Sequence, residues 1–396
     1  MKIMVINLGS TSFKFKIFGM GEQIELLSQG GFEDIGKEIS HYQIVSGEYK
    51  EQGDVQCKTH VSAFHLSKDI ILKCGAIQSL DELDVIGYKA VHGGKISGVR
   101  FVDEELLRIM EQYISFAPAH NPLYIDMIRE IKEQYPQLIQ IAHFETMFHS
   151  TIPRKRVVYG VPYEWIDTYG IRKYGFHGSS HSYISHKMRK IRPEAKRIIS
   201  IHLGGSSSLC AILDGKSVAT TMGATPQSGI FHNNRIGEFD VFCLPLLVEQ
   251  YENDINKVMN ILSSKSGFQG LSGVSNDLRD IIQAARHSKD ERAQLAIDAF
   301  VDGIVGYIGM YTAYLGGVDA IVFTGGIGQH SSLIRKMVCD SLQFLKVSLD
   351  ADKMEQCFDS RISDNKSEVD VWVLETNEEL SVAMNIEEYL RMRDDD

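Results

Sequence analysis

The sequence predicts a soluble α/β protein with two domains and a sheet core in each. Three observations support this. The 396 residues exceed what a single compact core usually takes. Strand patterns and helical patterns are mixed in both halves of the chain, which is typical of α/β architecture. Finally, in each half a run of β-forming residues breaks into a loop of small residues and then resumes, at residues 6–15 and at residues 201–210.

These two Gly–Ser loops are the most informative feature of the chain. Without a bulky side chain, such a loop brings backbone N–H groups and hydroxyls close to a ligand, as phosphate binding requires. One such loop is more often a plain hairpin turn. A pair of them, one in each half, predicts a duplicated scaffold with a nucleotide in the cleft between the halves.

In the first half, alternating β-forming runs on either side of the Gly–Ser loop predict a hairpin. The expected strands are at residues 2–8, 13–18, 24–30, 41–46, 85–91 and 138–144. Apolar residues at helical spacing predict helices. These are at residues 61–74, 104–113 and 122–134. Glu145 directly follows the last of these strands, and α/β folds place ligands at the carboxyl ends of their strands.

The second half repeats this pattern. The expected strands are at residues 197–203, 208–213, 217–221 and 320–324, and the expected helices are at residues 243–252, 256–263, 277–288 and 290–315. Asp214-Gly215 is a strong two-residue hairpin signal. The basic run at residues 154–156 is expected to be a solvated loop. The predicted N-terminal domain comprises residues 1–147 and 380–396, with a returning C-terminal helix, and the C-terminal domain comprises residues 148–379.

Composition narrows the class of partner. Lys and Arg number 41 against 52 Asp and Glu, a net charge of −11, which disfavours nucleic acid and anionic membranes but not an anionic substrate. Six scattered cysteines without a Cys-x-x-Cys pair predict reduced thiols in a cytoplasmic protein. The first strand begins at residue 2, which leaves no room for a signal peptide. The apolar stretch at residues 303–318 is short for a membrane span and predicts a buried helix.

Several catalytic motifs are absent from the sequence. It has no P-loop, no Gly-x-Gly-x-x-Gly after a strand and no Gly-x-Ser-x-Gly. Residues 177–181 contain His and Ser without an acid, and a strand-to-helix turn with a Ser N-cap is the simpler interpretation. What remains is a set of polar residues at strand ends and in loops, where α/β folds bind ligands. They are Asn7, Ser10, Ser12, Lys14, Lys89, His92, His120, Glu145, His177, His202, Arg235 and Glu378.

Nine segments, in order, resemble the acetokinase family of acetate, propionate and butyrate kinases, which belongs to the sugar kinase/Hsp70/actin superfamily. For example, Asn7-Leu8-Gly9-Ser10-Thr11-Ser12-Phe13-Lys14 is similar to the family's Asn-x-Gly-Ser-Ser-Ser-x-Lys. The nine segments are residues 7–14, 91–94, 117–122, 144–149, 174–181, 222–226, 275–280, 323–328 and 376–380. Together they extend over nearly the whole chain.

The resemblance implies a fold, an activity and its cofactors. The fold is a duplicated, ribonuclease H-like α/β fold with an active-site cleft between two domains. The activity is reversible, ATP-dependent phosphorylation of acetate, or a slightly larger acid such as propionate, to an acyl phosphate. Mg²⁺ or Mn²⁺ would assist, and the protein would be a cytoplasmic homodimer. Phosphoryl transfer of this kind depends mostly on positioning and charge stabilisation.

The resemblance also implies a role for each matching residue. The catalytic residues would be Arg235, His177, Lys89 and Glu145. The metal ligands would be Asn7 and Glu378. The ATP-binding residues would be Lys14, Ser12, His202, Gly204, Gly205, Ser206, Asp277, Arg279, Gly326, Ile327 and Gly328. The substrate pocket would be lined by Lys89, Val91, Ala119, Phe176 and Pro226.

Four departures from the family pattern lie at these positions. Lys89 replaces an arginine and gives up its bidentate geometry, and Glu145 replaces an aspartate and is one methylene longer. Gly205 replaces an asparagine, so an amide side chain near the phosphates is lost. Ala119 replaces a leucine, which favours a larger alkyl group by about 0.8 kcal/mol for each methylene buried.

Two alternatives stay open at this point. The chain is a phosphotransferase with a different carboxylate or phosphoryl donor, or it is a catalytically impaired, nucleotide-binding regulatory homologue. Retention of Asn7, His177, Arg235 and Glu378 favours catalysis, whereas Lys89 and Glu145 favour impairment.

Overall fold

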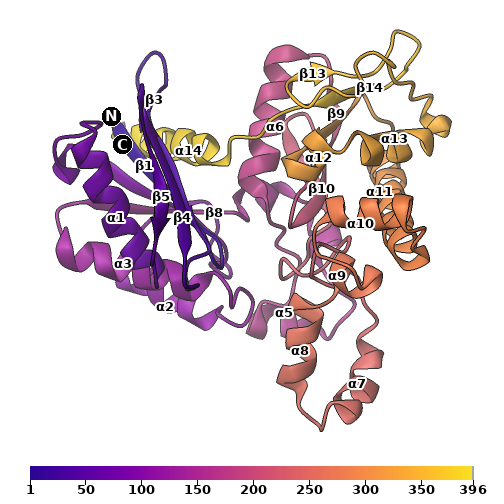
Figure 1. Ribbon diagram of the computed structural model, residues 1–396, viewed down its shortest axis with the longest axis horizontal. Coiled ribbons are helices and arrows are strands. Elements are labelled where there is room, and N and C mark those ends of the chain that lie inside the picture. The colour runs from indigo at the N-terminus through magenta and orange to yellow at the C-terminus, as the bar shows by residue number, and fades with distance from the viewer. Residues whose placement is uncertain (395–396) are drawn as a thin grey trace. The chain divides into compact units, whose positions relative to one another are not determined.

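The computed structural model describes residues 1–394, which form two compact units. Unit 1 comprises Met1–Met147 with the described part of Asn377–Asp396, and unit 2 comprises Phe148–Thr376. Each unit has one sheet with helices on both faces (Figure 1). Residues 395 and 396, the end of the predicted N-terminal domain, lie outside the described residues.

The sheet of unit 1 has eight strands in the order β5-β4-β3-β2-β1-β6-β8-β7. They are β1 (Lys2–Leu8), β2 (Phe13–Gly19), β3 (Glu25–Glu33), β4 (Ser40–Ser46), β5 (Tyr49–Val55), β6 (Val85–Ala90), β7 (Val99–Phe101) and β8 (Ile139–Phe144). The predicted hairpin is confirmed, because β1 and β2 pair antiparallel around the Gly–Ser loop. Since β6 runs parallel to β1 and β8 runs parallel to β6, the carboxyl ends of these three strands lie at one edge.

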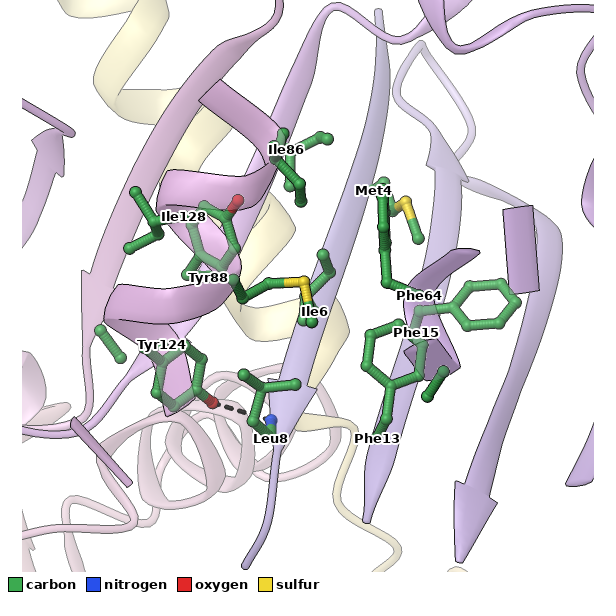
Figure 2. Close-up of a cluster of buried hydrophobic side chains, with 14 of the residues drawn as sticks. Met4, Ile6, Leu8, Phe13, Phe15, Phe64, Ile86, Tyr88, Tyr124 and Ile128 are labelled. Carbon is green, nitrogen blue, oxygen red and sulfur yellow. Dashed lines mark hydrogen bonds between the residues drawn. The ribbon is translucent and has the colours of Figure 1, made fainter. Parts of the chain in front are cut away.

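Helices cover both faces of this sheet (Figure 1). They are α1 (His60–Lys73), α2 (Glu104–Gln112), α3 (Asn121–Gln134) and α14 (Glu378–Asp394), with a 3-10 turn at Leu80–Glu82. On the first face, Figure 2 shows Phe64 of α1 and Ile128 of α3 packed with Met4 and Ile6 of β1 and other apolar side chains. On the opposite face, α14 packs its own apolar side chains against the sheet.

One polar contact inside this core holds the end of β1. The backbone N–H of Leu8 donates a hydrogen bond to the hydroxyl of Tyr124 on α3, at 2.9 Å (Figure 2). Burial raises the pKa of Tyr124 above its usual value. The hydroxyl therefore stays protonated and fixes the strand next to Asn7.

The sheet of unit 2 has six strands in the order β11-β10-β9-β12-β14-β13. They are β9 (Arg197–Leu203), β10 (Ser207–Leu213), β11 (Lys216–Thr220), β12 (Ala320–Thr324), β13 (Ser360–Arg361) and β14 (Asp370–Val373). β9 and β10 form a second antiparallel pair around a Gly–Ser loop. The predicted turn at Asp214-Gly215 is confirmed, and both residues have positive φ, 49° and 81°.

Helices again cover both faces in unit 2. They are α4 (Arg154–Val157), α5 (Tyr163–Tyr169), α6 (Gly178–Ile191), α7 (Leu244–Gln250), α8 (Ile255–Ser264), α9 (Gly267–Ser272), α10 (Leu278–His287), α11 (Glu291–Leu315), α12 (Gly325–His330) and α13 (Ser332–Asp340), with 3-10 turns at Val241–Cys243 and Gln343–Leu345. One core cluster joins α11 to the sheet, and another joins α6 to the opposite face.

Helix α11 is the one helix of residues 1–394 whose length and composition would allow it to cross a membrane, with a mean hydropathy of 1.3. Its side chains Ala296, Phe300, Ile304 and Ile308 are buried in the core of unit 2. Within the apolar stretch at residues 303–318, Ile304, Ile308, Tyr311 and Leu315 are buried, whereas Met310 and Tyr314 are exposed. The predicted burial is therefore confirmed for one face of the helix only.

The structure corrects the prediction at several elements. β5 was not predicted because its sequence, Tyr49 to Val55, is polar and its residues alternate between partly and fully exposed at the sheet edge. The basic run at residues 154–156 was predicted as a solvated loop but forms α4. Arg154 and Lys155 are exposed, whereas Arg156 is partly buried, donates to the carbonyl of Val218 and lies over the ring of Tyr314.

The turn at residues 177–181 also differs from the prediction. No strand leads directly into α6, since residues 170–177 are not in a strand, and the N-cap residue is His177, not a serine. His177 has φ +57°, a left-handed conformation that is costly for a residue with a side chain.

Candidate functional site

The carboxyl edge of the unit 1 sheet brings together three predicted site residues. Asn7 is in β1, Lys89 is in β6, and Glu145 follows β8 directly. Parallel pairing of β1 with β6 and of β6 with β8 sets them side by side, and the N–H of Glu145 donates to the carbonyl of Ala90 at 2.8 Å. These residues are close because the strands are parallel, a long-range fact that the local sequence does not contain.

The first turn of α14 completes this cluster with two glutamates. Lys89 forms an ion pair with Glu378, and the two side chains are only 12% and 15% exposed. Burial alone would lower the pKa of Lys89, but the carboxylates of Glu378 and Glu145 raise it above its usual value. The sequence prediction placed Glu378 and Glu379 in the C-terminal domain, whereas the structure places both in unit 1, because their partners are there.

Glu379, which the sequence analysis did not single out, holds a second set of contacts. Its Oε1 accepts a hydrogen bond from Nδ2 of Asn7 at 2.8 Å, and its Oε2 lies 3.2 Å from Nζ of Lys16. Lys16 also donates to Oδ1 of Asn377 at 2.9 Å. The adjacent Glu-Glu pair is visible in the sequence, but its contact with Asn7, 372 residues away, is not.

Two of the predicted residues, Asn7 and Lys14, line a groove of about 880 Å³ in unit 1. Lys14 forms an exposed ion pair with Glu33 at 3.0 Å. Ser12 lies outside the groove lining and closes the Gly–Ser loop, where its carbonyl accepts from the N–H of Gly9 at 2.9 Å.

The residues predicted for the substrate pocket lie in both units. In unit 1, Val91 packs against the core, and Ala119 is exposed in the turn before α3. In unit 2, Phe176 is buried, and Pro226 is buried beside Arg235. That these four residues line one pocket stays a prediction.

Arg235 contacts two other predicted residues of unit 2. Its Nη1 donates to Oγ of Ser206 at 3.2 Å and to the carbonyl of Pro226 at 3.3 Å. Burial lowers the pKa of Arg235 from its usual value, yet a guanidinium stays charged in proteins. The site therefore holds a partly desolvated cation whose remaining N–H groups suit an anionic ligand.

The rings of two predicted histidines lie against each other in the same unit, with 30° between their planes. The rings of His177 and His202 have centroids 4.3 Å apart. Nδ1 of His177 is 2.8 Å from Oγ of Ser208, and Nδ1 of His202 is 2.8 Å from Oγ of Ser180. Each ring is thus held through its Nδ1.

A cavity of about 440 Å³ in unit 2 gathers most of the residues predicted to bind ATP. Its lining includes the predicted Gly204, Gly205, Asp277, Arg279, Gly326 and Ile327. Gly328 lies outside the lining and packs against β12, and His202 and Ser206 also lie outside. At the cavity, Arg279 donates to both carboxylate oxygens of Asp277, and this contact lowers the pKa of Asp277.

Sequence reasoning missed Asn233, which lines this cavity. A Cβ built on Gly205 would lie 3.8 Å from Nδ2 of Asn233, so the asparagine amide lies over the bare glycine. Its Oδ1 is buried and has no hydrogen-bond partner among residues 1–394. Asn233 is two residues from Arg235, and this proximity was the available signal. The cavity also includes Leu278, Ile282, His330 and Ser331, which were not predicted.

Buried neutral histidines predict that acid destabilises both units. Burial lowers the pKa of His143 and of His149 to about 4 and that of His232 to about 3. As pH falls below 6.5, the unfolded chain gains protons that the native protein excludes. The free energy of unfolding should then fall by up to about 1.4 kcal/mol per pH unit for each group.

Urea unfolding followed by circular dichroism at pH 7 and pH 5 measures this loss. His143→Gln is the matched variant, because Nε2 of His143 accepts from Asn385 at 3.0 Å and a glutamine oxygen can accept the same bond. We expect the free energy of unfolding of this variant to fall less steeply between pH 7 and pH 5, by the contribution of one histidine. An equal slope in both proteins would contradict the assignment.

The chain matches known proteins along nearly its full length. It matches the model described as the acetokinase family over residues 2–384. It is 39% identical over 389 residues to the acetate kinase of Acholeplasma laidlawii, covering 98% of each chain. It is similar to the structure of a propionate kinase from Francisella tularensis (32% identity, TM-score 0.89) and to that of the Porphyromonas gingivalis acetate kinase (34% identity, TM-score 0.85), each covering 97% of this chain and 98% of the other.

Proposed function

This chain belongs to the acetokinase family, and from that premise we propose that it phosphorylates acetate, or a slightly larger carboxylate such as propionate, with ATP. The observation that carries the proposal is the cavity of unit 2, whose Gly-rich walls lie in the same unit as the half-buried guanidinium of Arg235. A carboxylate oxygen attacks the γ-phosphorus of ATP, the bond to the bridging oxygen breaks, and ADP leaves with the electron pair. No proton transfer is needed to balance this step.

We assign ATP to the 440 Å³ cavity. Its glycines expose backbone N–H groups to phosphates, and a Cβ on Gly326 would meet no atom within 4 Å, so the wall there is open. Ile327 and Ile282 offer apolar surface to a purine, and Asp277 and Arg279 offer polar contacts to its sugar. The cavity volume falls in the range of small-molecule sites.

The proposed catalytic groups of unit 2 stabilise charge. Arg235 would bind the carboxylate and the transferring phosphoryl group through its planar fork, and His177 would donate to the equatorial oxygens. Both side chains are held before substrate arrives, Arg235 by Ser206 and Pro226, and His177 by Ser208. Donors fixed in advance need no reorganisation during the reaction.

The proposed metal is Mg²⁺ or Mn²⁺, held through Asn7 and Glu378. Among residues 1–394, no group of three His, Cys, Asp or Glu side chains forms a metal site alone. This fits Mg²⁺, which keeps several waters and takes one or two protein oxygens beside phosphate oxygens. The donors at the unit 1 edge are amide and carboxylate oxygens, as a hard cation prefers. When bound, the ion would neutralise charge on the phosphates.

We also propose that the protein is a cytoplasmic homodimer without nucleic acid or membrane partners. The net charge of −11 supports the last point. The acyl pocket would take acetate or propionate, since the family relatives include both acetate and propionate kinases and Ala119 is small.

The test is hydroxylamine trapping of acyl phosphate by the full-length protein with Mg²⁺-ATP and carboxylates from acetate to pentanoate. We expect hydroxamate from acetate or propionate above the level without enzyme. Silence across the panel would reject the kinase assignment. If ADP still bound, the regulatory alternative would replace it.

Asn233 supplies a sharper test of the ATP cavity. Asn233→Ala should raise the KM for ATP about 10-fold, the loss of one hydrogen bond to a charged group. Adding Gly205→Asn to this variant should recover most of the affinity, because the new side chain would begin 3.8 Å from the amide it replaces. Initial rates at varied ATP concentration measure the KM, and isothermal titration with ADP measures the nucleotide affinity of both variants. If the double variant binds ADP no more tightly than Asn233→Ala, the hypothesis that the Asn233 amide replaces the amide missing at position 205 is wrong.

A further inference from the structure

A chain of hydrogen bonds runs from His177 into the sheet of unit 2, between α6 and the strands β9 and β10. Nδ1 of His177 is 2.8 Å from Oγ of Ser208 on β10. The same Oγ is 2.9 Å from Nε2 of His181, in the first turn of α6. Nδ1 of His181 is in turn 2.9 Å from Oγ of Ser200 on β9. Ser200, His181 and Ser208 are fully buried, whereas His177 is partly exposed.

The charge state of the central ring follows from its surroundings. Burial holds the pKa of His181 well below its usual value, so this imidazole is neutral at pH 7. A neutral imidazole donates from one ring nitrogen and accepts at the other. The chain therefore has a direction, and two directions are conceivable.

The hydroxyl of Ser200 decides between them. In the described part of the chain, its Oγ has one hydrogen-bond partner, Nδ1 of His181. If Ser200 donates this bond, Nε2 of His181 carries the proton and donates to Ser208. In the reverse direction, the hydrogen of Ser200 would be buried without an acceptor, which costs about 1–3 kcal/mol.

The preferred direction reaches His177 through Ser208. Since the Ser208 oxygen accepts from His181, its own hydrogen is free to be donated to Nδ1 of His177. A ring that accepts at Nδ1 carries its proton on Nε2. A protonated His177 would instead donate from Nδ1 and force the whole chain into the unfavourable direction.

We propose that Ser200, His181 and Ser208 form a one-directional relay that keeps His177 neutral, with its proton on Nε2. The three are positioning residues, acting through His177. The inference rests on the proposed function, in which His177 donates to the transferring phosphoryl group. The relay supplies an Nε2–H donor that is set before substrate binds and needs no proton uptake.

Nuclear magnetic resonance of the full-length protein, labelled with ¹⁵N in its histidines and without substrates, tests the relay directly. Long-range ¹H–¹⁵N spectra show which ring nitrogen carries the proton, and His177→Gln identifies the His177 signals. We expect the proton on Nε2 at pH 7. A proton on Nδ1, or on both nitrogens, would overturn the proposal without any relay variant.

The decisive variant is Ser200→Ala, because the Ser200 hydroxyl bonds to His181 and not to His177. It should shift His177 toward a mixture of tautomers and lower kcat about 10-fold, since a misplaced imidazole proton slows catalysis. The KM for ATP should stay within about twofold. Ser208→Ala should change the His177 ring signals and kcat more than Ser200→Ala does. Ser208→Thr keeps the hydroxyl, so its ring signals and kcat should match those of the unsubstituted protein.

Ser217→Ala is the matched control. Ser217 is also fully buried and lies 2.9 Å from Nδ1 of His149, whose Nε2 donates to the carbonyl of Phe176. Its loss should leave the His177 ring signals unchanged. Unchanged His177 signals in Ser200→Ala would reject the relay. These spectra need no substrate, so they test the relay separately from the proposed function. If the ring signals are as expected but no hydroxamate forms, the relay is supported and only the proposed function is contradicted.

Discussion

Arg235→Ala is expected to lower kcat for acyl phosphate formation about 1,000-fold, at the upper end of what one lost transition-state donor costs. The guanidinium is partly desolvated and is aimed by Ser206 and Pro226. Arg235→Lys keeps the charge but loses the planar fork, so an intermediate loss of about 100-fold is expected. Hydroxamate formation under saturating ATP measures both.

Arg292→Ala is the control for this series. Its guanidinium donates to the backbone carbonyls of Leu271 and Gly270, and it lies outside the lining of the ATP cavity. We expect its kcat to match the unsubstituted protein. If Arg235→Ala kept kcat within 10-fold while ADP still bound, Arg235 would not be the group that stabilises the transferring phosphoryl.

Lys89→Met is expected to destabilise unit 1 by about 3 kcal/mol, because it leaves two carboxylates near each other without their cation. The folded pKa of Lys89 is raised, so the stabilisation is fully present at pH 7, below its unfolded pKa, and is lost only as pH rises through the folded pKa. Both Trp residues, Trp165 and Trp372, are in unit 2. Hydrogen exchange of β1 and β6 peptides is therefore the measurement that reports on unit 1.

The control for Lys89 is a surface ion pair of the same unit. Lys132 lies 2.7 Å from Glu104, with side chains 49% and 73% exposed, so Lys132→Met should cost less than about 1 kcal/mol. Equal protection in Lys89→Met and Lys132→Met would show that the Lys89 pair contributes no more than a solvated one.

A double variant that includes Lys89 tests whether Lys89 and Glu145 retune catalysis or weaken it. Lys89→Arg combined with Glu145→Asp restores the pair that the family resemblance implies. A large gain in kcat would mean that the native pair is impaired, and a loss would mean that it is matched to its own partner, Glu378. We expect a loss, because Lys89 already has a buried carboxylate partner in the structure.

Much of the fold was predictable because its determinants are local. The β1–β2 hairpin follows from alternating residues around a Gly–Ser loop, and the turn at Asp214-Gly215 follows from two residues that tolerate positive φ. Helix α11 follows from its apolar spacing. The polar edge strand β5 was missed because its pairing partner, and not its own composition, makes it a strand.

The predicted site residues followed from ordered motifs, and each motif is again local. The departures of this chain from the family pattern were also visible in the sequence, but the contacts that accompany them were not. Gly205 was recognised as a lost amide, whereas Asn233, which lies over it, is 28 residues further along the chain. Glu379 was not recognised as the partner of Asn7 for the same reason.

By itself, the sequence determined the α/β class, the two Gly–Ser loops and the family, and it supplied the residues that we propose bind phosphate and carboxylate. Those properties depend on residue type and on short spacing. Only the tertiary structure decided which side chains meet: Lys89 with Glu378, Asn7 with Glu379, and His177 with a buried row of hydrogen bonds. These contacts depend on parallel strand pairing and on helix packing, which bring distant residues together by burying apolar surface that no local pattern specifies.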